Sequence, residues 1–342
     1  MKKKEVLAFV DHPFHKKTRS ADFLRNIFKK RFRIINIWGQ NLNYKKLKKY
    51  KNIFFFQSFL SFKNLISLQD KKIIWAPMYD SLSNFDKNIF QICALFPNIK
   101  ILSFSDEIRK YCIKYNVKYE NFTYMIKPTY DNKKNKNFNI FFWYRGSTKI
   151  FDWIKAINFL NYDNIYYFKL VDPKYTNENL SKNFLKKHKI KIFQGHKTFS
   201  QSKKKYISLL KKSSIFVAPR IKEGIGMSNI EAMSNSKYII GFNENNLNQY
   251  LKKKEMGLLL NTKRKVKVSK KYIIKTEYKR YQNYLKIYKK WLKDEKKIKN
   301  LYDHSVRNSL NKNLKFYRLF YENIFFNMKS LIIKKIILIR DF

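Results

Sequence analysis

Short apolar runs alternate with polar, helix-like stretches over the first 130 residues of the chain. A helix is predicted around Ser20–Lys30, and the runs typical of buried strands are Val6–Val10, Arg33–Trp38, Asn52–Gln57, Lys72–Pro77 and Ile99–Ser105. Because continuous apolar runs indicate strands covered on both faces, this pattern predicts a parallel sheet with crossover helices, the doubly wound α/β class. Ligands of such sheets bind beyond the carboxyl ends of the strands.

The same alternation starts again after Lys127–Asn137, a polar segment with Pro128 that is typical of an interdomain linker. The strands predicted beyond it are Phe138–Trp143, Ile165–Val171, Lys189–Phe193, Ser214–Ala218 and Lys237–Gly241. The helices predicted between them are Phe151–Leu160, Tyr206–Lys212 and one that begins near Ser228. The pattern therefore predicts a second α/β unit of similar size.

The character of the chain changes at Thr262. Lys263–Lys271 is strongly basic, and Tyr272–Asn300 carries apolar residues at helical spacing, which predicts one or two long basic helices. The apolar stretch Ser330–Asp341 is either a terminal helix packed on the body or an amphipathic membrane contact. We therefore expect two Rossmann-like domains, 1–130 and 131–262, and a basic helical extension, 263–342.

The composition adds a strong positive charge. Lysine and arginine number 75 against 24 acidic residues, which gives a formal net charge of +51. Such a charge indicates an anionic partner: nucleic acid, an acidic membrane surface or a phosphorylated substrate. Most of the basic excess is lysine, and the lysine comes with abundant Asn, Ile, Phe and Tyr, residues that share A/T-rich codons. A low-GC genome is therefore a competing explanation of the charge.

Targeting and cysteine chemistry are not indicated. Val6–Val10 is too short for the core of a signal peptide, and no stretch reaches the roughly 20 apolar residues that span a bilayer. We expect a cytoplasmic protein, at most peripheral on the inner face of the membrane. Cys93 and Cys112, the only two cysteines, are expected in the core rather than in a metal site or a disulfide.

Glycine marks the first candidate site. The chain has 7 glycines, and four of them fall between Gly224 and Gly257. A predicted strand, a short loop with Glu223 and two glycines, and a helix start follow one another here. Backbone N–H groups at a helix start, approached closely past glycines, form a site for an anion such as a phosphate.

This segment resembles the donor-sugar motif of retaining GT-B glycosyltransferases of the family 4 type. The match rests on Glu223, Gly224, Gly226 and Glu231-Ala232-Met233, with seven residues between the two glutamates. By this resemblance Glu231 would hold the ribose hydroxyls of a nucleotide. Glu223 would contact the sugar or stabilise positive charge at its anomeric carbon. The backbone of Gly224, Ile225, Gly226 and Met227 would contact the diphosphate or the sugar.

The resemblance continues to about Asn261, with two departures. The chain has Ser234-Asn235-Ser236 where the family usually has a glycine, and Gln249 where it has an acidic residue. The amino-terminal half matches only as architecture. Both departures fall where the family selects its sugar.

The leaving diphosphate needs positive charge. No two aspartates have the D-x-D spacing of metal-dependent glycosyltransferases, so no metal site and no cofactor are expected. GT-B enzymes use arginine and lysine at the start of the second domain instead. Arg145 and Lys149, just past the predicted strand Phe138–Trp143, are therefore the candidate cations, Arg145 as a bidentate phosphate ligand and Lys149 as a point charge.

The acceptor side offers weaker candidates. The first strand leads into a loop with His12 and His15, and the fourth leads to Asp80. A histidine here would be catalytic or bind the acceptor, and Asp80 would orient a hydroxyl. A surface loop and a helix cap are the structural alternatives.

The sequence thus predicts a glycosyltransferase that moves a sugar from a nucleotide diphosphate sugar to a glycan or lipid-linked glycan, with retention and without metal. Its basic extension would contact anionic lipid. Three alternatives stay open. The first is an inverting GT-B enzyme with Asp11, His12, His15 or Asp80 as general base. The others are a catalytically inactive relative and a nucleic-acid-binding protein, which no recognisable binding motif supports.

Overall fold

In the computed structural model, the described residues are 4–39, 44–58, 62–82, 88–129, 137–144, 150–157, 159–170, 180–196, 199–217, 220, 223–242, 249–251, 253–260, 268–298 and 300–303. Structural statements below refer to these residues. Arg145, Lys149, Ser330–Asp341 and most of the predicted linker lie outside them, as does most of Lys263–Lys271. The boundaries at 130 and 262 therefore stay predictions.

The first domain is a six-stranded parallel sheet in the order β2-β1-β3-β4-β5-β6. Its strands are β1 Val6–Asp11, β2 Arg33–Trp38, β3 Asn52–Phe56, β4 Lys72–Ala76, β5 Ile99–Ser103 and β6 Tyr119–Asn121. Its helices are α1 His15–Thr18, α2 Asp22–Lys29, α3 Phe62–Ser67, α4 Asn88–Ala94 and α5 Asp106–Lys114, with short 3-10 turns η1 Tyr44–Leu47 and η2 Tyr79–Ser81. The strand order reverses between β1 and β3, so this is the switch point of the sheet.

The second domain has a six-stranded parallel sheet in the order β12-β11-β10-β7-β8-β9. The strands are β7 Ile140–Trp143, β8 Ile165–Lys169, β9 Ile190–Gln194, β10 Ile215–Val217, β11 Tyr238–Phe242 and β12 Gly257–Leu260. The helices are α6 Ile150–Ile157, α7 Lys182–Lys187, α8 Phe199–Lys211 and α9 Met227–Ser234. This is the strand order of dinucleotide-binding domains, and its switch point lies between β7 and β10.

The residues of each strand alternate between the two faces of its sheet. The two sheets together therefore form three hydrophobic clusters, one on the outer face of each sheet and one that the other two faces share. One cluster takes the outer face of the first sheet with α3, α4 and α5, and another takes the outer face of the second sheet with α6 and α10 (Lys270–Lys275). The third joins the remaining faces of both sheets to α2, α8, α9 and α11 (Glu277–Ile298). Because this last cluster is shared, the two domains pack against each other.

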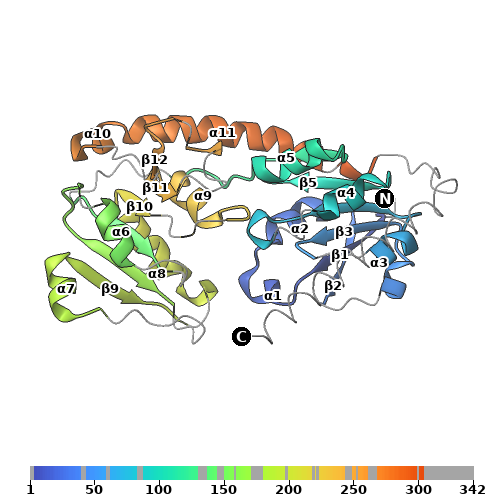
Figure 1. The fold of residues 1–342 in the computed structure, drawn as a ribbon, viewed down its shortest axis with the longest axis horizontal. Helices are drawn as coiled ribbons and strands as arrows, with labels where there is room; N and C mark the ends of the chain where they lie inside the picture. The colour runs from blue at the N-terminus through green and yellow to red at the C-terminus, as the bar shows by residue number, and fades with distance from the viewer. Residues whose placement is uncertain are drawn as a thin grey trace, which may run out of the picture.

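The carboxy-terminal helices tie the two domains together. α10 lies over the second domain, and α11 runs from there across to the first domain (Figure 1). The Tyr284 hydroxyl accepts a hydrogen bond from the Ile126 N–H and donates one to the Ile126 carbonyl, at 3.2 and 2.7 Å. At the far end, in η4 (Leu301–Asp303), the Tyr302 hydroxyl donates to the Ile53 carbonyl of β3 at 2.9 Å. The described part of the basic extension is thus an interdomain brace.

The two-domain α/β architecture predicted from the sequence is confirmed. The predicted strands end within two residues of the observed ones. Several elements differ: β6 and the helices α1, α3, α4, α5 and α7 were not predicted individually, β12 was expected only as part of the family motif, and α8 begins at Phe199 rather than Tyr206. Cys93 and Cys112 are buried free thiols in the core, as expected.

Candidate active site

The candidate residues gather beyond the carboxyl ends of the strands beside the two switch points. Glu223 and Gly224 follow β10 in the second domain, while His15 follows β1 and Asp80 follows β4 in the first. This is the place where open α/β sheets bind ligands. Arg145 and Lys149 belong to the same edge by sequence, after β7, but lie outside the described residues.

The start of α9 has the geometry of an anion site. Gly226 is the residue before the helix and has φ 71° and ψ 46°, the left-handed conformation that glycine adopts without strain. Its carbonyl accepts hydrogen bonds from the N–H groups of Asn229 and Ile230, both at 3.0 Å. The N–H groups of Met227 and Ser228 begin the helix and have no partner within it. They and the helix dipole favour a negative ligand here.

Glu231 lies on the same helix and is buried. Its Oε1 is 3.8 Å from the Lys203 Nζ of α8, an ion pair whose lysine is exposed. Burial raises the pKa of Glu231, and Lys203 and a hydrogen bond with Tyr206 offset part of that rise. A buried carboxylate with an elevated pKa is typical of a functional position rather than of a solvated helix face.

Asn229 is a second buried polar residue on the first turn of α9. It is fully buried, and neither its amide nitrogen nor its amide oxygen has a hydrogen-bond partner in the part of the chain that the structure describes. An atom on Gly226 in the position of Cβ would lie 3.2 Å from the Asn229 Nδ2. Such an unsatisfied amide is costly and needs an explanation, which a bound ligand or water at the helix start would supply.

Two catalytic candidates from different domains meet. The Arg220 Nη1 lies 3.4 Å from the Asp80 Oδ2 of the first domain and 3.4 Å from the Glu223 Oε2 of the second. A Cβ on Gly224 would come within 2.9 Å of the Asp80 Oδ1 and 3.2 Å of Met78. The domains therefore touch at Glu223 and Gly224, and a side chain at position 224 would force Asp80 or Met78 to move.

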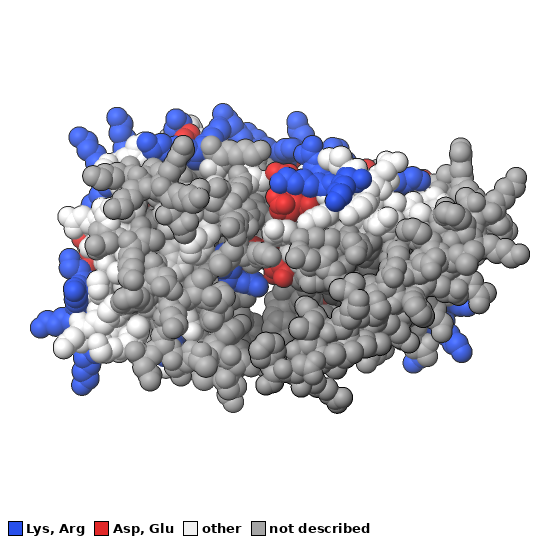
Figure 2. All heavy atoms as spheres, viewed as in Figure 1, with Lys and Arg blue, Asp and Glu red and all other residues white. Residues whose placement is uncertain are grey.

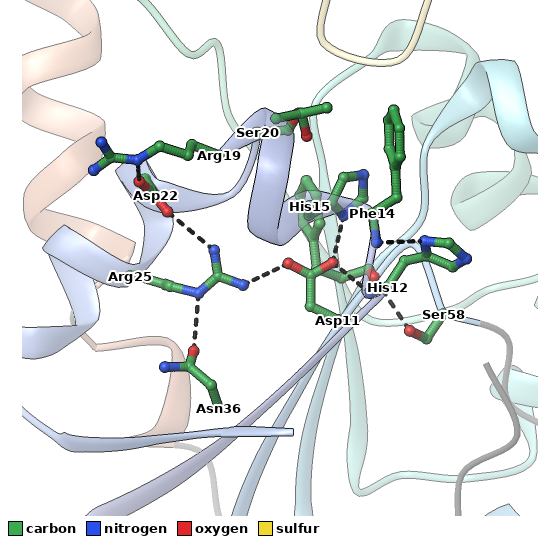
Figure 3. Close-up of polar contacts among 12 residues, drawn as sticks. Asp11, His12, Phe14, His15, Arg19, Ser20, Asp22, Arg25, Asn36 and Ser58 are labelled. Carbon is green, nitrogen blue, oxygen red and sulfur yellow. Dashed lines mark hydrogen bonds and ion pairs between the residues drawn. The ribbon is translucent and has the colours of Figure 1, made fainter. Parts of the chain in front are cut away.

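His15 belongs to a separate buried cluster (Figure 3). The Asp11 carboxylate, at the end of β1, is fully buried and contacts the His15 Nδ1 and the Arg25 Nη2, each at 2.5 Å. It also accepts the His12 backbone N–H at 2.7 Å. Arg25 pairs with the other oxygen of this carboxylate. Because a carboxylate only accepts hydrogen bonds, the His15 Nδ1 is the donor in this contact.

The structure thus brings together Asp80, Glu223 and Gly224, and places Glu231 farther along α9. It does not place His15 in that group. Arg220 was not predicted from the sequence, because the residues around Arg220 do not indicate that Asp80 of the first domain lies beside it.

Both departures from the family motif have structural consequences. Ser236 has φ 57°, a left-handed conformation where glycine would be free of strain, and the Arg280 Nε donates to its carbonyl at 2.7 Å. Gln249 donates from its side chain to the Phe104 carbonyl of the first domain at 3.3 Å. An acidic residue could not make that contact.

The described residues contain no group of three or more His, Cys, Asp or Glu that could hold a metal ion. None of their helices is long and apolar enough to cross a bilayer.

Comparison with known proteins identifies the second half of the chain. Residues 154–302 match the family described as glycosyl transferases, group 1. No curated protein matches the sequence.

Solved structures give the fold. A glycosyltransferase from Rickettsia africae is 12% identical over 86% of this chain and 98% of its own, with a TM-score of 0.59. Sucrose-phosphate synthase from Thermosynechococcus elongatus is 11% identical over 96% and 100%, with a TM-score of 0.52. The lipopolysaccharide outer core galactosyltransferase WaaB is 10% identical over 85% and 99%, with a TM-score of 0.51. The match to the GtfA/B complex spans only 59% of the chain matched there.

Proposed function

We propose that the protein transfers a sugar from a nucleotide diphosphate sugar to a glycan or lipid-linked glycan, since residues 154–302 match the group 1 glycosyl transferases and the chain has the GT-B fold. One observation carries the proposal. Glu223, the left-handed Gly226, the free N–H groups at the start of α9 and the buried Glu231 occupy one continuous segment beside the β7–β10 switch point.

Each part of that segment suits one part of a nucleotide sugar. The N–H groups of Met227 and Ser228 would receive the diphosphate, since they point out of the helix start. The Glu231 carboxylate would accept hydrogen bonds from the two hydroxyls of a ribose. Arg145 and Lys149 are proposed as further phosphate ligands from the other side of the switch point.

We propose transfer with retention and without a metal ion. Glu223 stands at the domain junction, where its charge would stabilise a sugar that becomes positive as the diphosphate leaves. Arginine and lysine side chains and helix N–H groups would balance the charge of the leaving group, so the reaction has no need of a cation held by aspartates.

The acceptor is proposed from the kind of chemistry that similar proteins perform. WaaB is named for lipopolysaccharide outer core synthesis. An acceptor of the same kind, a growing glycan of a bacterial surface polysaccharide, would enter from the first domain, on the side of Asp80.

An inverting mechanism is the second candidate, and the Asp11–His15 contact favours it. With a proton on Nδ1 held by Asp11, the Nε2 of His15 is the basic nitrogen, as in a general base that takes a hydroxyl proton. The configuration at the anomeric carbon of the product, measured by NMR, decides between the two mechanisms.

A membrane partner is proposed for the outer face of α10 and α11. The exposed residues of these helices include nine lysines and no acidic residue. Lys and Arg side chains line the upper edge of the molecule over these helices (Figure 2). Tyr278 and Leu292 are exposed on α11, 58% and 42% accessible. Lysines with intervening apolar side chains suit an anionic lipid surface.

Turnover tests the proposal. Purified protein is incubated with UDP-glucose, UDP-N-acetylglucosamine, UDP-galactose or GDP-mannose, with a lipopolysaccharide core acceptor and EDTA, and release of the nucleoside diphosphate is followed. We expect one donor to be consumed, with a rate that falls at least about 100-fold in Glu223→Gln. Turnover that is unchanged in Glu223→Gln would remove Glu223 from the mechanism.

A further inference from the structure

Arg220 occupies an unusual place for an arginine. Its Nη1 is equally distant, at 3.4 Å, from one carboxylate of each domain. Its side chain is 30% exposed, whereas those of Asp80 and Glu223 are 17% and 12% exposed. The Asp80 Oδ2 and the Glu223 Oε2 therefore lie no farther apart than the sum of those two distances. Because both side chains are largely shielded from water, the repulsion between their negative charges is strong.

The arginine offsets that repulsion. Without its charge, closing the domains would bring Asp80 and Glu223 together as two anions. With it, each carboxylate has a cation in ion-pair range, and both contacts use the same nitrogen. The guanidinium thus sets where the Glu223 carboxylate lies relative to the first domain.

A second feature shows that the contact is close packing and not a chance approach of long side chains. Gly224, next to Glu223, lies so near Asp80 that a methyl group there would come within 2.9 Å of the Asp80 Oδ1. That oxygen is buried and has no hydrogen-bond partner among the described residues. The backbone of one domain and a turn of the other therefore meet at the same point that Arg220 bridges.

We propose that Arg220 is a positioning residue: it links Glu223 to Asp80 across the domain junction and so assembles the sugar-binding side of the site only when the domains are closed. This inference rests on the proposed function in one respect, since it assigns Glu223 to the sugar. The bridge itself is a structural claim that stands without any activity.

Loss of Arg220 should affect catalysis and nucleotide binding differently. The proposed nucleotide contacts all lie on the second domain and do not include Asp80. Loss of Arg220 should therefore slow the transfer step more than it weakens nucleotide binding, because a misplaced catalytic group costs rate when the bound nucleotide is unaffected.

The first test is the shape of the ligand-free protein. Small-angle X-ray scattering is recorded at low and high salt for wild type, Arg220→Ala, Asp80→Asn and the double variant, with Arg109→Ala as the control. Arg109 is exposed and pairs only weakly, at 4.0 Å, with Asp106 on its own helix. We expect a larger radius of gyration for Arg220→Ala and for Asp80→Asn, no further increase in the double variant, and no change in the control.

The second test is kinetic. With whichever donor the wild type consumes, Arg220→Ala should lower kcat roughly 10- to 100-fold while UDP or GDP affinity changes less than about threefold. Arg220→Lys keeps the charge and should recover part of kcat. Asp80→Asn serves if Arg220→Ala does not fold.

The two tests fail separately. Scattering and kcat that match wild type in Arg220→Ala and Asp80→Asn would overturn the bridge. An equal loss of nucleotide affinity and kcat would instead make Arg220 a direct ligand of the donor and overturn the positioning role. A wild type that consumes no donor would defeat the proposed function, while the scattering result would still decide the bridge.

Discussion

At the residue scale, the candidate site is a set of carboxylates whose surroundings differ. Glu231 is buried beside one exposed lysine, Glu223 shares a guanidinium with the other domain, and Asp11 is held by Arg25 inside the first domain. The same functional group therefore has three different surroundings, and each carboxylate can be tested by itself.

Glu231→Gln should strengthen the fold and weaken binding. Folding raises the pKa of the wild-type Glu231 above the ordinary 4.5. Keeping this buried carboxylate ionised therefore lowers the stability of the wild type at a pH above the raised pKa. This loss of stability becomes smaller as the pH falls toward 4.5. We therefore expect Glu231→Gln to have a higher free energy of unfolding than wild type at pH 7.5. Its affinity for a nucleoside diphosphate should drop roughly 10- to 100-fold, because hydrogen bonds to a charged group are lost.

The same carboxylate predicts a pH dependence of binding. Wild-type affinity should fall as the pH is lowered through the raised pKa. Lys203 lowers the pKa of Glu231. In Lys203→Ala the loss of nucleotide affinity should therefore begin at a higher pH than in wild type, whereas in Lys204→Ala it should begin at the same pH as in wild type. Calorimetric titration between pH 5 and pH 8 measures both, and superimposed curves for the two variants would contradict this assignment.

Ser236→Gly should stabilise the protein. Ser236 is buried with φ 57° and its hydroxyl has no hydrogen-bond partner, so glycine relieves backbone strain and removes an unsatisfied group. We expect the free energy of unfolding to rise by about 0.5–1 kcal/mol. Ser234→Gly is the matched control: it lies inside α9, where glycine should cost about 1 kcal/mol. Urea unfolding of both variants measures the difference.

At the scale of elements, strands were predictable and several helices were not. Fully buried parallel strands such as β3 and β4 are continuous apolar runs, so their bounds can be read from the sequence. Edge strand β6 is short and polar, Tyr-Glu-Asn, and has no such signal. The first turns of α8 consist mostly of Ser, Gln and Lys and show no apolar periodicity, so the start of this helix at Phe199 could not be predicted from the sequence.

The candidate site divides in the same way. Glu223 and Glu231 were predictable because their chemistry is encoded in one continuous motif. The Asp80–Arg220 contact and the Asp11–His15–Arg25 cluster join residues that only the fold brings together, so the sequence could suggest Asp80 and His15 but not their partners.

Helix α11 should depend on one tyrosine. Tyr284→Phe removes the hydroxyl that serves both the N–H and the carbonyl of Ile126, which leaves two backbone groups unsatisfied at the domain junction. We expect a loss of about 1–3 kcal/mol in the free energy of unfolding. Tyr278→Phe, on the exposed face of the same helix, should change it by less than about 0.5 kcal/mol. Equal urea midpoints for the two variants would count against the brace.

At the scale of the whole molecule, charge is placed unevenly. The brace formed by α10 and α11 presents lysines outward, while its inner face packs on both domains. A membrane contact through this brace would act on both domains at once, because α11 touches each of them.

Charge reversal tests the membrane contact. Lys286, Lys289, Lys293 and Lys296 are exposed on α11; replaced together by Glu, they should reduce binding to phosphatidylglycerol vesicles by more than about tenfold. The control set Lys182, Lys186, Lys187 and Lys189, on and next to α7, changes net charge equally and should have a smaller effect. Equal loss in both sets would show that net charge alone binds the vesicles.

The central claim is that the segment from Glu223 to Glu231 binds a nucleotide sugar. A thermal-shift panel of nucleoside diphosphates and their sugars, in EDTA, on wild type, Glu231→Ala and the control Glu107→Ala tests it most directly, because a ligand of the folded state raises Tm by mass action. The account predicts a shift with one nucleotide in wild type and in Glu107→Ala, and none in Glu231→Ala. No shift in wild type, together with salt-sensitive binding of RNA, would contradict it.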